Sequence, residues 1–340
     1  MTEFELRFSV QIRPRMKVLF IGGAGNISAD CAALLHERGH EIFLLTRGRA
    51  KVPPGYTAIV ADRKDAAAMR AGLKGSQFDV AIDFLGYELA EVQQDHDLFN
   101  GMVRQYIFIS SASAYQTPPR SLPVTESTPL DNPFWQYSRD KIACEEALLL
   151  AYRQDKFPFT VVRPSHTYDR TLFPCHGGYT VIHRMRQGKP VVVHGDGTSL
   201  WTLTHHEDFA RAFVGLLGHA RTIGDFFHIT SDEWLTWDQI HHILADVAKT
   251  KADIVHLPSE IIAKHDRDWG DSLVGDKTHS MIFDNSKVKR LVPGWEAQIP
   301  FSRGAEEIMA YYDADPIRQV VDKAFDATMD KLVEVARRLH

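Results

Sequence analysis

The chain has 340 residues, of which 44% are hydrophobic and 24% charged, and its formal net charge is −5 at pH 7. These values predict an ordinary globular protein with one large core or two unequal ones. No apolar run approaches the roughly 18 residues of a membrane span, and the N-terminus lacks the basic and apolar parts of a signal sequence. The lack of a membrane span and of a signal sequence leads us to expect a cytoplasmic protein. Because no long basic run is present either, we expect it to act on a small molecule, with neither nucleic acid nor a membrane as partner.

The three cysteines, Cys31, Cys144 and Cys175, are widely spaced and form no CxxC pair. This spacing favours reduced thiols over a disulfide framework. Cys175 lies in a glycine-rich loop, where we consider a thiol nucleophile but favour a lid over the substrate. The histidine pairs at 205–206 and 241–242 lack the spacing of zinc ligands, so we expect no metal site.

Residues 1–15 precede the first predicted strand that belongs to the alternating pattern of strands and helices. Apolar and polar residues alternate in this segment as in a half-exposed strand, but a lone strand needs a sheet edge with which to pair. We expect an N-terminal extension here, and a globular fold that begins near Met16.

Short apolar runs typical of β-strands alternate with helical patterns over the next 150 residues or so. The predicted strands cover residues 18–21, 42–45, 58–60, 80–84, 106–110 and 159–162, and the predicted helices include 27–38 and 137–153. This alternation predicts βαβ units and a doubly wound, Rossmann-type parallel sheet of the α/β class.

We divide the chain into a main domain over residues 16–170, to which residues 204–230 return, and a smaller α/β substrate lobe over 171–340. The later part of the chain is predicted to hold helices near 206–218 and 236–249, strands at 226–229 and 253–256, and a final helical stretch beyond Ser302. Trp234 and Trp237 are expected to pack inside the smaller lobe. The active site is expected in the cleft between the two parts.

A glycine-rich turn, GGAGNIS over residues 22–28, follows the first predicted strand and opens a helix. Gly22 and Gly25 allow a sharp turn and the close approach of a pyrophosphate to the helix N-terminus. Ser28 stands where a third glycine is usual and is small enough to serve. The main domain is therefore predicted to bind NAD(P), with Gly22, Gly25, Asn26 and Ile27 against the cofactor; a merely structural turn is the alternative.

The second predicted strand ends in Thr46-Arg47, where NAD enzymes commonly carry an acid for the ribose hydroxyls. The acid is missing, and a guanidinium suits a 2′-phosphate, so NADP is favoured and NAD is the alternative. Two solvated surface arginines, Arg47 and Arg49, would be the structural explanation.

Two further strand ends are predicted to contact the cofactor. In the Asp62-Arg63 pair, the carboxylate could accept a hydrogen bond from the adenine amine, and Leu85 ends the fourth strand beside the expected cofactor. The alternative at both places is that these residues simply end a strand and have no role in binding.

Tyr137 and Lys141 are four residues apart in a predicted helix, which places both side chains on one face. A phenol with a pKa near 10 is a poor acid or base at neutral pH, and a neighbouring ammonium lowers that pKa by stabilising phenolate. Lys141 is also expected to hold the nicotinamide ribose. Upstream, a buried strand ends in Ser110-Ser111-Ala112-Ser113, where Ser111 is our choice for binding a substrate oxygen and Ser113 the second choice.

Together these motifs resemble the extended short-chain dehydrogenases/reductases, the NAD(P)-dependent epimerase/dehydratase family, from Met16 onward. GGAGNIS matches the family's glycine loop, SSASAY its serine strand and YSRDK its tyrosine–lysine helix. The resemblance implies that Pro164 and His166 lie near the nicotinamide. It further implies that GDG at 195–197 opens the substrate lobe, and that the helix after Lys141 takes part in a homodimer.

The chain also departs from the family. Sugar-nucleotide members carry an arginine where this chain has Trp201, and the segment after Arg163 resembles an atypical subgroup related to chloroplast RNA-binding proteins. An indole offers a flat apolar wall suited to a free sugar, and His166 is a further candidate substrate contact. In the alternative arrangement Trp201 fills the interface between the lobes, while Arg184, Arg186 or His205 binds phosphate.

The expected function is hydride transfer at a hydroxyl or keto carbon of a sugar-like substrate that is not a nucleotide sugar. The net reaction would be oxidation or reduction, or a transient keto step inside an epimerase or dehydratase. The alternatives are a nucleotide-sugar epimerase and a catalytically idle RNA-binding or regulatory protein that keeps the fold.

Overall fold

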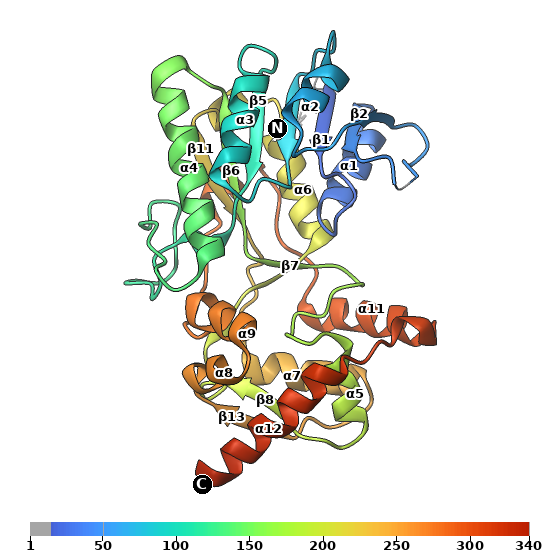
Figure 1. Cartoon of the computed structure of the whole chain (residues 1–340), viewed down its shortest axis with the longest axis vertical. Helices are drawn as coiled ribbons and strands as arrows, with labels where there is room; N and C mark the ends of the chain where they lie inside the picture. Colours follow the sequence, from blue (N-terminus) through green and yellow to red (C-terminus); the bar gives the residue numbers. More distant parts are fainter. Residues whose placement is uncertain (1–14, 50, 340) are drawn as a thin grey trace, which may run out of the picture.

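The computed structural model describes residues 15–49 and 51–339. The extension expected over residues 1–15 therefore lies outside the described residues, apart from Arg15. Figure 1 shows an upper part built around a sheet and a lower, smaller part made mostly of helices, with β7 (His166–Tyr168) running between them.

Seven parallel strands form the sheet of the upper part, in the order β11-β6-β5-β4-β1-β2-β3. They are β1 (Lys17–Ile21), β2 (Glu41–Thr46), β3 (Thr57–Val60), β4 (Val80–Asp83), β5 (Gln105–Ile109), β6 (Phe159–Pro164) and β11 (Asp225–Ile229). Val18 of β1 pairs with Ile42 of β2 on one side and with Val80 of β4 on the other. The predicted doubly wound Rossmann-type sheet is confirmed, because the order reverses at β1, where such folds bind their ligands.

Helices cover both faces of this sheet, because neighbouring strand residues point to opposite faces. They are α1 (Ser28–Glu37), α2 (Ala66–Leu73), α3 (Leu89–Phe99), α4 (Gln136–Asp155) and α6 (His206–Leu216). Val18 and Phe20 of β1 belong to the core under α1 and α6, while Leu19 and Ile21 belong to the core under α2, α3 and α4. Figure 1 shows α4 and α3 side by side at the left of the sheet.

The smaller part has its own core, in which three short two-stranded sheets pack against helices. Its strand pairs are β7 with β10 (Leu203–His205), β9 (Leu200–Trp201) with β12 (Leu235–Thr236), and β8 (Val191–His194) with β13 (Ile254–Leu257). Its helices are α5 (Tyr179–Arg186), α7 (Trp237–Val247), α8 (Ser259–His265), α9 (Arg267–Ser272), α11 (Phe301–Asp313) and α12 (Lys323–Leu339). A further helix, α10 (Ser286–Leu291), packs its Val288 into the core under α1 and α6.

The structure corrects two expectations about the smaller part. Trp237 is buried at 3% exposure, but Trp234 is 54% exposed, because it lies in the turn ahead of β12 and only Trp237 enters the amphipathic helix α7. The single helical stretch expected beyond Ser302 is two helices, α11 and α12. Over the residues that the structure describes, no helix combines the length and the apolar character that crossing a membrane requires.

Candidate active site

The glycine loop connects β1 to α1 at the centre of the sheet. Gly22 has a φ of 87°, and a Cβ there would lie 2.4 Å from Cγ of Leu85, so only glycine fits between the strand and the neighbouring loop. Ser28 closes the turn by accepting a hydrogen bond at Oγ from the Gly25 amide at 2.8 Å. The serine that replaces the third glycine thus stabilises the loop.

Two cavities of about 480 and 450 Å³ adjoin the glycine loop and share Gly22, Ala24, Leu85 and Tyr87. The outer cavity lies along the ends of β2 and β3 and is lined by Arg47, Asp62 and Arg63, among others. The inner cavity is lined by Gly25, Asn26, Ile27, Tyr137, Lys141 and Pro164, among others. Together they make an elongated site at the reversal point of the sheet, and its glycine cradle fits a dinucleotide.

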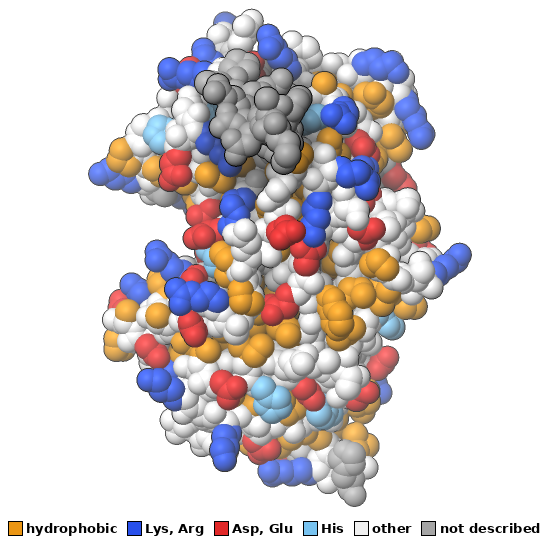
Figure 2. Space-filling model, turned by 180° about the vertical axis from the view of Figure 1, so that it is seen from behind, with side chains coloured by type: hydrophobic (Ala, Val, Ile, Leu, Met, Phe, Trp, Pro, Cys, Tyr) orange, Lys and Arg blue, Asp and Glu red, His pale blue; other side chains and the backbone are white. Residues whose placement is uncertain are grey.

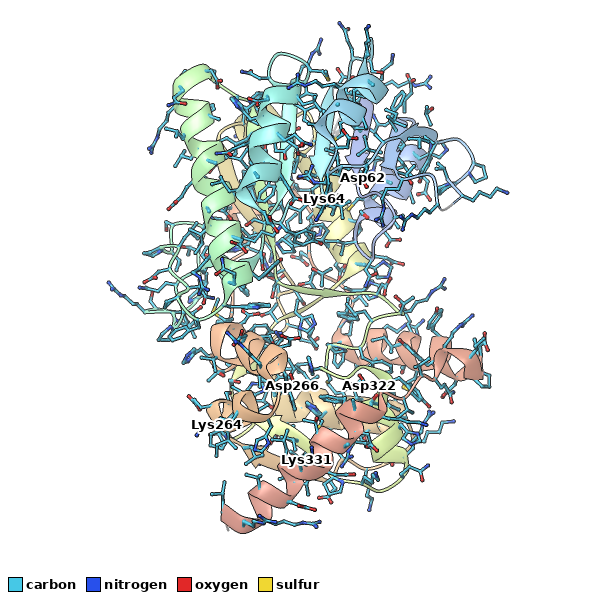
Figure 3. All side chains as sticks on the ribbon, in the orientation of Figure 1. Asp62, Lys64, Lys264, Asp266, Asp322 and Lys331 are labelled. Atoms are coloured by element: carbon cyan, nitrogen blue, oxygen red, sulfur yellow. The ribbon has the colours of Figure 1, made fainter. Side chains whose placement is uncertain are left out.

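The outer cavity is lined by charged side chains of both signs, since the carboxylates of Asp62, Glu88 and Glu91 accompany four cations. Arg47, Lys51 and Lys64 line it with exposed side chains, whereas β2 ends in Thr46 and offers no acid. Figure 3 shows Asp62 and Lys64 together in the upper part of the molecule, where β3 ends. An arginine directly after a strand end that lacks an acid suits a phosphate better than free ribose hydroxyls.

Arg63 differs from the expectation that it contacts the cofactor. Its guanidinium is buried and donates to Asp83 at 2.7 Å and to Asp95 at 3.0 Å. The two carboxylates hold the terminal nitrogens, so Arg63 lines the outer cavity as part of its wall with its charge already paired.

Tyr137 and Lys141 lie in the first turns of α4 and face the inner cavity. Burial raises the pKa of Tyr137 to about 12, although a hydrogen bond with Ser111 acts in the opposite direction. Burial lowers the pKa of Lys141 to about 8. Lys141 Nζ donates to the carbonyl oxygens of Gly86 at 2.6 Å and Ile109 at 2.8 Å, so the ammonium is anchored between the ends of β4 and β5.

The two candidate serines have different environments. Ser113 is 3% exposed, and its hydroxyl accepts a hydrogen bond from Ser138 of α4 at 2.9 Å. Ser111 is half-buried, lies 2.9 Å from the Ser113 hydroxyl and forms the hydrogen bond with Tyr137. The accessible hydroxyl beside the phenol is therefore that of Ser111, and Ser113 holds it in place.

A third cavity, of about 230 Å³, lies in the smaller part and is lined by His166, Cys175, His194 and Lys277, among others. Lys277 Nζ lies 5.6 Å from the ring centre of Trp135, whose ring is 4.9 Å from that of Tyr137. The Trp135 ring therefore lies between Lys277, which lines this cavity, and the phenol of Tyr137. The structure places His166 in this cavity and not beside the glycine loop, and burial lowers the pKa of its imidazole to about 3.

Trp201 is a packing residue, which corrects the expectation of an indole wall for a ligand. It is 3% exposed, its ring lies 5.7 Å from that of Trp237, and its N–H donates to His166 Nδ1 at 3.1 Å. The three groups considered as phosphate ligands are already paired with carboxylates. Arg184 pairs with Asp326 and Asp330, Arg186 with Asp313, and His205 with Glu307.

The thiol of Cys175 lies 3.7 Å from His241 Nε2, but burial raises the pKa of that thiol to about 12. A neutral thiol is a weak nucleophile, so the pair has the character of core packing. Within the described residues, no group of three or more histidine, cysteine or acidic side chains is placed to hold a metal ion.

Sequence reasoning missed Tyr87, Ser138 and Lys277. Tyr87 follows Leu85 by two residues and lines both cofactor-side cavities, so the strand-end pattern could have found it. Ser138 directly follows Tyr137 and faces inward. Lys277 comes from a π-helical turn at 273–277 far along the chain, and no local pattern indicates that it returns to the site.

Comparison with known proteins finds relatives that match most of the chain. A protein from Arabidopsis thaliana named chloroplast stem-loop binding protein of 41 kDa b is 27% identical over 335 residues, covering 93% of this chain and 84% of that protein. The 2'-dehydrokanamycin reductase of Streptomyces kanamyceticus is 26% identical over 297 residues, covering 86% and 83%.

Solved structures share the fold at low identity. An epimerase from Methanothermobacter thermautotrophicus has a TM-score of 0.73 at 15% identity and covers 90% of this chain and 94% of its own. The dTDP-glucose 4,6-dehydratase of Bacillus anthracis, solved in complex with NAD, has a TM-score of 0.72 at 18% identity, covering 89% and 98%. The family model described as NAD dependent epimerase/dehydratase matches residues 18–229, more than half of the chain. The chain is therefore a member of the NAD-dependent epimerase/dehydratase family.

Proposed function

We propose that this protein transfers hydride between NADP and a hydroxyl or keto carbon of a sugar-like substrate that is not a nucleotide sugar. The observation that carries the proposal is the convergence of Tyr137 and Lys141 on the cavity formed by the glycine loop, with Ser111 hydrogen-bonded to the phenol. A bound nicotinamide supplies or accepts the hydride, and the chain's own residues handle the proton.

In this proposal Tyr137 gives a proton to the substrate oxygen, or takes one from it, while Ser111 holds that oxygen by a hydrogen bond. Burial, with smaller contributions from Tyr87 and Asp276, raises the pKa of Tyr137 to about 12 despite the hydrogen bond with Ser111, and this is too high for such work near neutral pH. The Lys141 ammonium, 5.7 Å from the centre of the phenol ring, favours phenolate and so offsets part of the burial effect. Lys141 would also hold the nicotinamide ribose.

NADP is proposed over NAD because Arg47 lines the outer cavity directly after β2, and the end of that strand lacks an acid. A 2′-phosphate would gain charge-assisted hydrogen bonds there. Titration of both cofactors into the purified protein tests this choice. Tighter binding of NAD than of NADP would contradict it.

We take the third cavity as the substrate pocket. The charges around it support a substrate without a diphosphate. Its ammonium, Lys277, lies 3.7 Å from the carboxylate of Asp276, and burial keeps His166 and His194 neutral by lowering their pKa values to about 3 and about 4. A diphosphate would enter with little positive charge to balance it. Calorimetry with uridine-, thymidine- and guanosine-diphosphate sugars at saturating cofactor tests this point. Micromolar binding of one of them with turnover would replace the proposal by a nucleotide-sugar epimerase.

Net oxidation or reduction is proposed over epimerisation or dehydration. The relative from Streptomyces kanamyceticus is a reductase by name and matches most of this chain. Cofactor that turns over with a simple alcohol or ketone would support this choice. Cofactor that stays bound through purification and is regenerated in every cycle would indicate an epimerase or dehydratase.

A stem-loop RNA-binding role is a second candidate, favoured by the similarity over 93% of the chain to the Arabidopsis protein of that name. Figure 2 shows lysine and arginine side chains interspersed with aspartate and glutamate on the face that it presents. RNA binding usually needs clustered positive charge, so this role ranks second. A mobility-shift titration with a stem-loop RNA tests it: binding that survives Tyr137→Phe and falls steeply with salt would support the RNA role.

A cytoplasmic homodimer is part of the proposal. All three cysteines are free and buried, as suits a reducing compartment. Dimerisation rests on the resemblance to the family alone, and light scattering of the purified protein measures it.

A further inference from the structure

A buried network of charges lies directly behind the catalytic lysine. Asp83, the last residue of β4, and Asp95 of α3 are both 0% exposed and share the guanidinium of Arg63. The hydroxyl of Tyr106 donates to Asp95 at 2.7 Å and completes the network. Buried charges are costly unless paired and hydrogen-bonded, so an arrangement with two acids around one guanidinium calls for a further role.

Asp83 differs from Asp95 in what else it holds. Asp83 Oδ1 accepts a hydrogen bond from the Leu85 amide at 2.8 Å, and the next residue, Gly86, offers its carbonyl to Lys141 Nζ at 2.6 Å. A Cβ on Gly86 would lie 2.4 Å from Asp83 Oδ2, so the loop rests directly on the carboxylate. Asp83 therefore fixes the loop that anchors the ammonium.

We propose that Asp83 is a positioning residue for Lys141 that acts in two ways, by holding the loop beneath the ammonium and by supporting its positive charge. Its carboxylate holds the 85–86 loop under the ammonium, and its pairing with Arg63 ties that loop to the wall of the outer cavity. The inference rests on the role proposed above for Lys141, but it concerns the ionisation of that lysine, which can be measured without substrate.

The surroundings of Lys141 support this assignment. The ionisable groups that act on its charge are Asp83 from β4, Glu91 from α3, and Cys144 and Glu145 from α4 itself, and the phenols of Tyr87 and Tyr137 also face it at 4.8 and 5.7 Å from their ring centres. Burial disfavours the ammonium most strongly, and Asp83 is the largest influence in its favour, whereas Asp95 is not among them. Removing the negative charge of Asp83 should thus leave a lysine that loses its proton at lower pH.

The test compares Asp83→Asn with Asp95→Asn, a control at the same burial and on the same guanidinium. Burial and the charge of Asp83 raise the pKa of Asp95 to about 8, so the titration extends well above this pH, where both carboxyl groups are ionised. Lysine isotope-labelled at Cε reports ionisation by NMR in the whole folded chain, and Lys141→Arg identifies the signal. In Asp83→Asn the midpoint of Lys141 ionisation is expected to fall by about one pH unit or more, the scale for loss of a nearby opposite charge. In Asp95→Asn it is expected to move much less.

An unchanged midpoint in folded Asp83→Asn would overturn the inference, and so would equal shifts in the two variants, because the effect would then belong to the network's total charge. If Asp83→Asn does not fold, Gly86→Ala takes its place, since the methyl group displaces the loop while every charge is kept. A lowered Lys141 midpoint is expected there too, and a wild-type midpoint would overturn the inference. Because none of these measurements uses turnover, a failure of the proposed hydride transfer would show separately.

Discussion

Tyr137 and Lys141 lie one helical turn apart on α4, with the ammonium nitrogen of Lys141 5.7 Å from the centre of the Tyr137 ring. A positive charge this close to the ring is expected to favour the phenolate form. The proposed function accordingly gives proton transfer to the phenol and electrostatic support to the lysine.

Tyr137→Phe is expected to lower kcat by more than about a hundredfold, the range of general acid–base catalysis, while cofactor affinity stays unchanged. Only the transferable proton is removed. Steady-state kinetics and a cofactor titration measure the two effects. Tyr152→Phe, a tyrosine near the other end of the same helix, serves as the control and should keep wild-type kcat. An equal loss of cofactor affinity in Tyr137→Phe would assign the phenol to binding.

The affinity for NADPH is expected to weaken as pH rises through about 8. Burial lowers the pKa of Lys141 to about 8, so the ammonium is present below this pH and lost above it. Lys141→Met should weaken binding at every pH, lower the rate and remove this pH dependence. Calorimetry from pH 6 to pH 9 measures the profile. Normal cofactor affinity in Lys141→Met would contradict the role given to the ammonium.

Arg47→Asp is expected to shift cofactor preference from NADP toward NAD by roughly 1.5–3 kcal/mol, the scale of hydrogen bonds to charged groups. The exposed guanidinium at the outer cavity is replaced by an acceptor for ribose hydroxyls. Titration of both cofactors into wild type and variant gives the difference. Arg104→Asp, with a side chain 88% exposed ahead of β5 and so at the opposite end of the sheet, should leave the preference unchanged.

Arg163→Met is expected to lower the free energy of unfolding by about 3–5 kcal/mol, because it leaves the Glu145 carboxylate buried without its cation. Both side chains are at most 3% exposed, and Arg163 Nε donates to Glu145 at 3.0 Å. Urea unfolding measures the change. The double variant Arg163→Met/Glu145→Met should recover most of the stability, and a double variant as unstable as the single one would contradict this explanation.

The sequence predicted the parts of the site that lie next to one another in the chain. Gly22 and Gly25, and Tyr137 with Lys141, carry their geometry in their spacing, because a strand–turn–helix and one helical turn place them without help from the rest of the fold. Six of the seven strands of the sheet followed from the same alternation of strands and helices, and the seventh, β11, lies in the segment 204–230 that was expected to return to the main domain.

The remaining contacts depend on tertiary packing, which no local pattern encodes. Arg63 was expected at the cofactor, but its partners Asp83 and Asp95 lie in β4 and α3, 20 and 32 residues further along the chain. Trp201 was expected to face a ligand, but Trp237 and Lys277, from other parts of the smaller lobe, enclose it. These three side chains meet only when the smaller lobe is folded.

The most direct test of the central claim is to incubate the protein with NADP and a panel of free sugars and polyols, and to follow formation of the reduced cofactor. The cofactor recovered from the protein is identified by mass spectrometry, and Tyr137→Phe is run in parallel. We predict NADPH formation with at least one unactivated sugar or polyol, and its loss by more than about a hundredfold in Tyr137→Phe. Equal rates in wild type and Tyr137→Phe, or absence of turnover with the whole panel in a protein that binds neither NADP nor NAD, would contradict the assignment.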